Sequence, residues 1–207
     1  LIAASDVGGV VHVHAMKDGA KQFTLKGHAH PVPVVRFLND GNRLLTAGAR
    51  SGASDMGRAT VWSLADQSEQ QTLNRPHVIT AADVNTAGTM LATVEESDAD
   101  GHIVRLWSLP GLEPRGQVGD HRKRIRHVRF APDGNSLVTA SSDGTARVFR
   151  LTGERIANIR VELPVRFASF SPDGQQVLTC SVGKGGSAQL WRVNDATEVL
   201  HFHGHRD

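Results

Sequence analysis

Turns built around glycine recur along this chain at a nearly constant interval, and this repeat limits the folds the chain can adopt. Four such turns end an apolar stretch, and their glycines lie 47, 46 and 40 residues apart. The four segments read RFLNDG (36–41), DVNTAG (83–88), RFAPDG (129–134) and SFSPDG (169–174). A period of roughly 40 to 50 residues indicates repeated structural units, each too small to bury a core alone.

Each turn is followed by two segments with the alternating polarity of β-strands. The first segment carries a threonine at one fixed position, and these residues are Thr46, Thr93, Thr139 and Thr179. The second segment ends in an aromatic residue, and these residues are Trp62, Trp107, Phe149 and Trp191. All three tryptophans of the chain therefore share one position of the repeat. Several short strands per unit, with no helical periodicity, predict an all-β propeller.

The repeat divides the chain into one partial blade and four complete four-stranded blades. The segments Leu1–Ser5 and Val10–His14 match the second and third strands of a unit, so the first blade (1–26) is expected to lack its innermost strand. The complete blades are expected at 27–74, 75–118, 119–160 and 161–203. Residues 204–207 match the start of a further repeat. We therefore expect a fragment of a larger propeller of about seven blades.

The pattern resembles the WD-repeat (WD40) family. Repeats of that family open with Gly-His, pass through a Ser-Pro-Asp-Gly turn and end their third strand in Trp-Asp. The pair Gly27-His28 matches the opening, and SPDG (171–174) matches the turn. The Trp-Asp pair itself is absent, because serine or arginine follows each tryptophan.

The resemblance implies a buried network of His, Ser or Thr, Asp and Trp within a blade. Matched residue by residue, the fourth blade supplies His121, Thr139 and Asp143, with Phe149 at the tryptophan position. An imidazole between a carboxylate and a hydroxyl has both ring nitrogens paired, as a low-dielectric interior requires.

The other blades match the network incompletely. The second blade supplies His28, Thr46 and Trp62, with Asp55 as a candidate fourth member, and Arg75 takes the histidine position of the third blade. The expected network residues are His28, Thr46, Trp62, Thr93, Trp107, His121, Thr139, Asp143, Thr179 and Trp191.

A grouping of His, Thr and Asp also suggests a catalytic triad, but its recurrence with the repeat favours a structural role. The sequence contains no Gly-x-Ser-x-Gly elbow, no P-loop and no His-Glu-x-x-His. We predict that the chain is not an enzyme and has no catalytic residues and no cofactor. The alternating His201, His203 and His205 could ligate zinc, and the acidic run 95–101 could hold a hard cation. Exposed strand or network histidines and a solvated loop are the simpler interpretations, so no metal site is predicted.

Loops on one face are the expected binding surface, because rigid scaffolds place function on their loops. In the WD family, the loops leading into each blade share a face with those joining its second and third strands. Unusual loops of the second kind are expected at 50–58, 95–101 and 182–187, beside the basic run 122–124. The candidate partner-binding residues are Arg50, Arg58, Glu95, Glu96, Asp98, Arg122, Lys123 and Arg124.

These observations predict a non-catalytic scaffold that binds protein or peptide partners. The mixed-sign charges of the loops suggest protein or peptide partners more than a uniform polyanion, so nucleic acid is not expected as a partner. One alternative is a regulatory or recruiting propeller of a larger enzyme, such as a bacterial signalling kinase or a hydrolase, with its catalytic part outside this chain. A second alternative is polyanion binding through the basic rim, which would weaken steeply with salt.

Composition bears on the compartment as well. No apolar run approaches the roughly 20 residues of a membrane-spanning helix. Cys180 is the single cysteine, which fits a reducing compartment, and we expect a cytoplasmic location.

Overall fold

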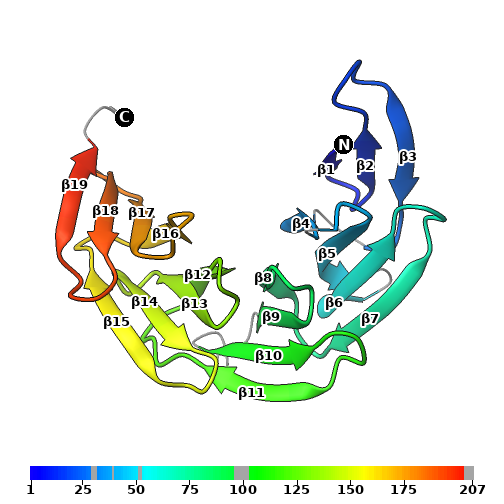
Figure 1. Cartoon of the computed structure of the whole chain (residues 1–207). Coiled ribbons are helices and arrows are strands. Elements are labelled where there is room, and N and C mark those ends of the chain that lie inside the picture. Colours follow the sequence, from blue (N-terminus) through cyan, green and yellow to red (C-terminus); the bar gives the residue numbers. More distant parts are fainter. Residues whose placement is uncertain (29–31, 39, 51–52, 96–102, 203–207) are drawn as a thin grey trace. The chain divides into compact units, whose positions relative to one another are not determined.

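The structure is a computed structural model that describes residues 1–28, 32–38, 40–50, 53–95 and 103–202, apart from the side chains of 50 and 53–55. Within these ranges it contains nineteen β-strands and no helix (Figure 1). The predicted all-β fold is confirmed.

The strands form five antiparallel sheets, and within each sheet the chain passes from one strand directly to its neighbour. The first sheet has three strands and the other four have four, as predicted for one partial and four complete blades. The first two sheets contain β1 (Ile2–Ser5), β2 (Val11–His14), β3 (Lys21–Leu25), β4 (Val34–Phe37), β5 (Arg43–Arg50), β6 (Ala53–Ser63) and β7 (Glu69–Arg75). The third contains β8 (Ile79–Val84), β9 (Met90–Glu95), β10 (Val104–Ser108) and β11 (Pro114–Val118). The last two contain β12 (Ile125–Phe130), β13 (Ser136–Ser141), β14 (Thr145–Arg150), β15 (Arg155–Arg160), β16 (Val165–Phe170), β17 (Gln176–Ser181), β18 (Ala188–Arg192) and β19 (Glu198–Phe202).

The position of a strand in its sheet explains its polarity. In the fourth sheet, β13 is an inner strand, and Leu137, Val138 and Ala140 are fully buried although they point to opposite faces. The last strand of the fifth sheet, β19, leaves most of its side chains exposed. Strands covered on both faces therefore read as continuous apolar runs. Outer strands such as β7 (EQQTLNR) read as polar, whereas β19 (EVLHF) leaves Leu200 and Phe202 exposed.

The chain packs as two compact units. The first consists mainly of residues 1–81 and contains the sheets β1–β3 and β4–β7. Their shared core includes Val13, Leu44 and Trp62. The Ser5 hydroxyl also donates to the Val32 carbonyl at 3.0 Å, which ties β1 to the segment before β4.

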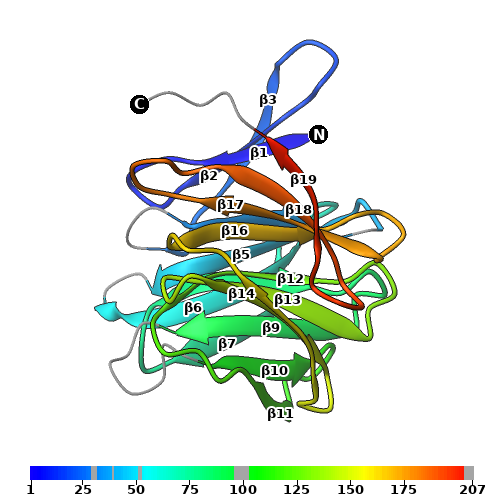
Figure 2. The ribbon, with the colours of Figure 1, turned by 90° about the vertical axis from the view of Figure 1, so that its left-hand side faces the viewer.

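The second unit contains the sheets β12–β15 and β16–β19 and most of β8–β11. The last two sheets pack face to face, and Val148 and Ile159 of one meet Val177 and Trp191 of the other. Within this pair, β12 and β16 lie on one side and β15 and β19 on the opposite side (Figures 1 and 2).

The prediction of a loop over residues 50–58 is wrong for most of that range. Strand β6 begins at Ala53, and its pairing with β5 includes Ala49 opposite Gly57. The segment after β7 passes directly over Gly57 in this hairpin and leaves no room for a side chain there. A Cβ atom at this glycine would lie only 2.2 Å from the backbone oxygen of His77.

We predict that Gly57→Ala lowers the free energy of unfolding by about 1–3 kcal/mol, since the methyl group would displace backbone. Chemical denaturation measures this change. Gly8→Ala is the matched control, because its Cβ would meet only the Asp6 carboxylate at 3.4 Å. Equal effects of the two substitutions would contradict the close approach at Gly57.

Candidate functional site

The fourth sheet holds the most complete polar network of the described chain. The Nε2 atom of His121 lies 2.7 Å from the hydroxyl oxygen of Thr139, and its Nδ1 atom lies 3.1 Å from the carboxylate of Asp143. The same carboxylate accepts the hydroxyl of Thr145 and the backbone N–H of Arg122, at 2.6 and 2.9 Å. The structure thus brings together three residues that the sequence had matched to one network.

Burial sets the protonation of this network. It lowers the pKa of His121, so the imidazole is neutral, donates from Nδ1 to Asp143 and accepts the Thr139 hydroxyl at Nε2. Burial also opposes ionisation of Asp143, but the hydrogen bonds from Thr145, the Arg122 N–H and His121 outweigh it. The pKa of Asp143 falls to about 2.

In the second sheet both ring nitrogens of the buried histidine are also paired, but with a different set of partners. The indole N–H of Trp62 donates to the Thr46 hydroxyl at 2.8 Å, and that hydroxyl lies 2.8 Å from Nε2 of His28. The Nδ1 atom of His28 lies 3.1 Å from the carbonyl oxygen of Ala49, which takes the place of a carboxylate. Burial again lowers the pKa of the imidazole. The side chain of Asp55, the candidate fourth member, lies outside the described residues.

The third and fifth sheets keep the threonine and tryptophan without a histidine. The Trp107 indole donates to Thr93 at 3.0 Å, and the Trp191 indole donates to Thr179 at 2.9 Å. Val161, which is buried, stands at the histidine position of the fifth sheet.

Glu95 was predicted on the binding rim, and this prediction is wrong. Only 3% of the residue is exposed, and its carboxylate accepts a hydrogen bond from Nε of Arg75 at 2.6 Å. The reason is that β9 continues to Glu95, which falls at the repeat position of the fully buried Ser141. A charge at that position needs a partner of opposite sign, which Arg75 provides from the histidine position.

Arg58 is also not a free rim residue. It lies within β6, where its guanidinium donates to the Glu69 carboxylate at 2.5 Å and to the Thr60 hydroxyl at 3.1 Å. Three further rim predictions fall outside the description, namely the side chain of Arg50 and residues Glu96 and Asp98.

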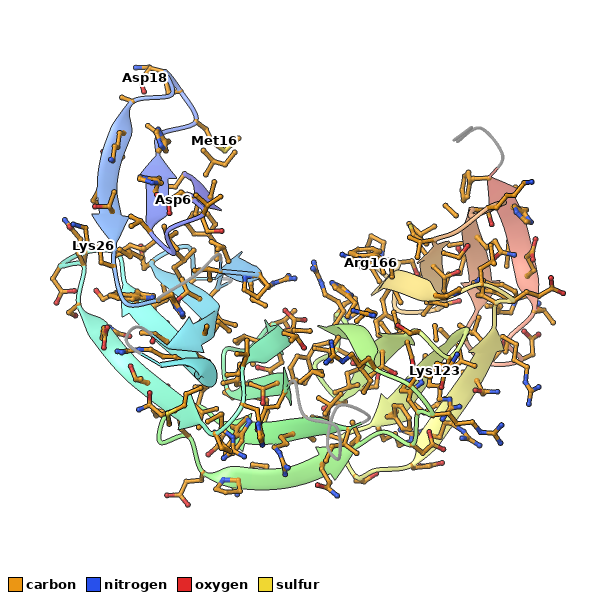
Figure 3. All side chains as sticks on the ribbon, turned by 180° about the vertical axis from the view of Figure 1, so that it is seen from behind. Asp6, Met16, Asp18, Lys26, Lys123 and Arg166 are labelled. Atoms are coloured by element: carbon orange, nitrogen blue, oxygen red, sulfur yellow. The ribbon has the colours of Figure 1, made fainter. Side chains whose placement is uncertain are left out.

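The basic loop 122–124 keeps its predicted exposure. The side chains of Arg122, Lys123 and Arg124 are exposed, and Figure 3 labels Lys123 among them. Their backbone is held by the neighbouring turn, because Ser141 donates its hydroxyl to the Lys123 carbonyl at 2.9 Å and Ser142 its N–H to the Arg124 carbonyl at 2.9 Å. Together with the bond from the Arg122 N–H to Asp143, these contacts fix the loop to the buried network.

Sequence reasoning missed a polar cleft beside this network. Arg147 is 92% buried, and its guanidinium donates to the carbonyl and carboxylate of Asp120 and to the side-chain oxygen of Asn158. The cleft has a volume of about 540 Å³, and Arg155 and Arg160 also line it. The sequence signal for this cleft was weak. Arg147 alternates with small apolar residues, a pattern that predicts a solvent-facing side chain on a strand and not a buried arginine.

The network geometry does not favour covalent chemistry, because Thr139 is fully buried and no substrate can reach its hydroxyl. Among the described side chains, no three His, Cys, Asp or Glu residues gather closely enough to hold a metal ion. His203 and His205 lie outside the description. The described ranges also contain no helix long and apolar enough to cross a membrane.

Comparisons with known proteins agree with the repeat analysis. The family model for the WD domain, G-beta repeat, matches residues 112–150 and 158–192. WD repeat-containing protein 1 of Mus musculus is 25% identical over 97% of this chain and 33% of its own length. WD repeat-containing protein 55 of Arabidopsis thaliana is 23% identical over 99% of this chain and 53% of its own length. An uncharacterised WD repeat-containing protein of Synechocystis is 32% identical over 65% of this chain and 37% of its own length. The chain spans about a third of the length of the vertebrate relatives it matches.

We predict that Asp143→Ala lowers the free energy of unfolding by about 2–4 kcal/mol, because it leaves the buried imidazole of His121 without its carboxylate partner. Asp133→Ala removes the same group from an exposed turn, where it accepts only the Asn135 N–H, and should cost less than about 1 kcal/mol. Thermal and chemical melts compare the variants. Equal destabilisation would refute the network role of Asp143.

The lowered pKa of Asp143 also predicts a pH dependence. The folded protein keeps this carboxyl ionised at a lower pH than the unfolded chain does, so the ionised form stabilises the fold. That stabilisation is complete above the ordinary value of 3.8 and is lost as the pH falls towards about 2. The gap in unfolding free energy between wild type and Asp143→Asn should therefore shrink over this window. A gap that stays constant would show that ionised Asp143 does not stabilise the fold.

Proposed function

We propose that this chain, which belongs to the WD40-repeat family, is a non-catalytic platform that binds protein or peptide partners through loops on one face of the propeller. WD-repeat proteins generally serve as scaffolds for protein interactions. The proposal assigns recognition to the basic loop 122–124 of the fourth blade.

The observation that carries this proposal is the contrast between the side chains and the backbone of that loop. All three of its cationic residues are exposed, and exposed charges can steer an oppositely charged partner. Its backbone is already fixed by Asp143, Ser141 and Ser142, so a partner would meet a preformed surface and little ordering would accompany binding.

The pairing of other cations favours a protein over a nucleic acid. Arg58, Arg75, Arg147 and Arg155 each donate to a carboxylate of this chain. These pairs reduce the charge available to follow a phosphate backbone, which would need a longer basic stripe. A short basic loop beside neutralised arginines fits an acidic patch on a protein surface.

We predict that changing Arg122, Lys123 and Arg124 together to Ser weakens partner capture and leaves stability nearly intact, since all three side chains are exposed. Capture is measured by pull-down with the full-length protein from its native lysate, and a thermal melt verifies folding.

The matched control replaces Arg115, Arg150 and Arg192 with Ser. These exposed residues lie at the opposite ends of their strands from the basic loop, so the control removes the same charge from another surface. Partners lost from the first variant and kept by the control would support the proposal. An unchanged partner profile in the first variant would exclude this loop as the recognition site.

A further inference from the structure

The cleft beside the basic loop has one wall built by a single hairpin. Strand pairing places Thr145 opposite Arg160 and Arg147 opposite Asn158 on β14 and β15. Because alternate residues of a strand share a face, these four side chains project from the same face of the sheet. Asp120 and Arg122, from the segment before β12, also line the cleft.

Four charged residues of the cleft are paired with one another. Asp120 is paired with both Arg147 and Arg155. Asp143 faces His121 and lies 3.6 Å from a nitrogen of Arg147. Two carboxylates thus balance two guanidinium groups.

The other three charged residues of the cleft are not balanced. Arg122, Arg160 and Glu162 are exposed residues that line the same cleft. In the part of the chain that the structure describes, neither of these two arginines has a carboxylate partner. The mouth of the cleft therefore carries one positive charge in excess, on groups with five N–H donors each.

We propose that this cleft binds the carboxylate of an Asp or Glu side chain in an exposed acidic segment of a partner protein, held between Arg122 and Arg160. The inference rests on the proposed function, since it assumes a protein partner, and it names the chemistry that the partner must present. A guanidinium binds a carboxylate through two parallel hydrogen bonds, which makes such a site selective as well as attractive.

The charge balance favours a carboxylate over a phosphate. A single excess positive charge matches a monoanion, whereas a phosphate group carries nearly two negative charges at neutral pH. The second charge would be repelled by the carboxylates of Glu162 and Asp120, which line the same cleft.

The test uses the full-length protein and three fluorescein-labelled hexapeptides, one of glutamate, one of glutamine and one of glutamine with a central phosphoserine. Fluorescence anisotropy at low ionic strength gives each Kd. The double variant Arg122→Gln, Arg160→Gln should bind the glutamate peptide about tenfold more weakly. The matched control Arg150→Gln, Arg192→Gln loses the same charge elsewhere and should bind within about twofold of wild type. Thermal melts verify that both variants fold.

Equal weakening in both double variants would overturn the proposal, because the attraction would then reflect overall charge. Tighter binding of the phosphoserine peptide than of the glutamate peptide would overturn the choice of ligand.

The single variant Arg160→Glu separates this proposal from the proposed function, because Arg160 lies outside the loop 122–124. If Arg160→Glu still binds the glutamate peptide while the triple Ser variant loses its partners, the cleft proposal fails and the loop proposal stands. Partner capture unaffected by the triple variant would exclude the loop and would overturn the cleft proposal with it, because that variant also removes Arg122.

Discussion

A buried threonine hydroxyl in the second strand of each four-stranded sheet organises the polar interior of that sheet. Thr46, Thr93, Thr139 and Thr179 are fully buried, so each hydroxyl needs partners inside the protein. In three sheets the partner is a tryptophan indole from the third strand. In the fourth sheet Phe149 has no N–H to donate, and the hydroxyl instead contacts His121 and the carbonyl of Arg147. The aromatic position can therefore vary, provided that another group meets the hydroxyl.

The same requirement connects the interior of the fourth sheet to its surface. Neutral His121 needs an acceptor at Nδ1, which Asp143 supplies, and the ionised carboxylate in turn attracts the Arg122 N–H and the guanidinium of Arg147. Arg147 then positions Asp120, which holds Arg155. A chain of paired charges thus runs from a fully buried hydroxyl to the mouth of an open cleft. The geometry of the proposed binding surface depends on groups that no partner would touch.

Much of this architecture could be predicted from the sequence, because the glycine turns, threonines and aromatic residues share one repeat register. That register predicted the all-β fold, the three-stranded first sheet and the grouping of His121, Thr139 and Asp143. It did not reveal the directions of charged side chains at strand ends, which depend on how far each hairpin continues. Arg58 and Glu95 were therefore placed on the rim, although both belong to strands. A signal for Glu95 was present, because it falls at the position of buried Ser141 while Arg75 stands at a histidine position.

The simple order of strands within each sheet has a consequence for how the chain folds. Every strand pairs with the strand that precedes or follows it in sequence, so each pairing closes only a short loop. Local pairings of this kind favour fast formation of each sheet, compared with folds that join distant segments. During synthesis the hairpins of one blade can form before the next blade has left the ribosome. Packing between successive blades, which buries residues such as Trp191 against the preceding sheet, would then follow the order of translation.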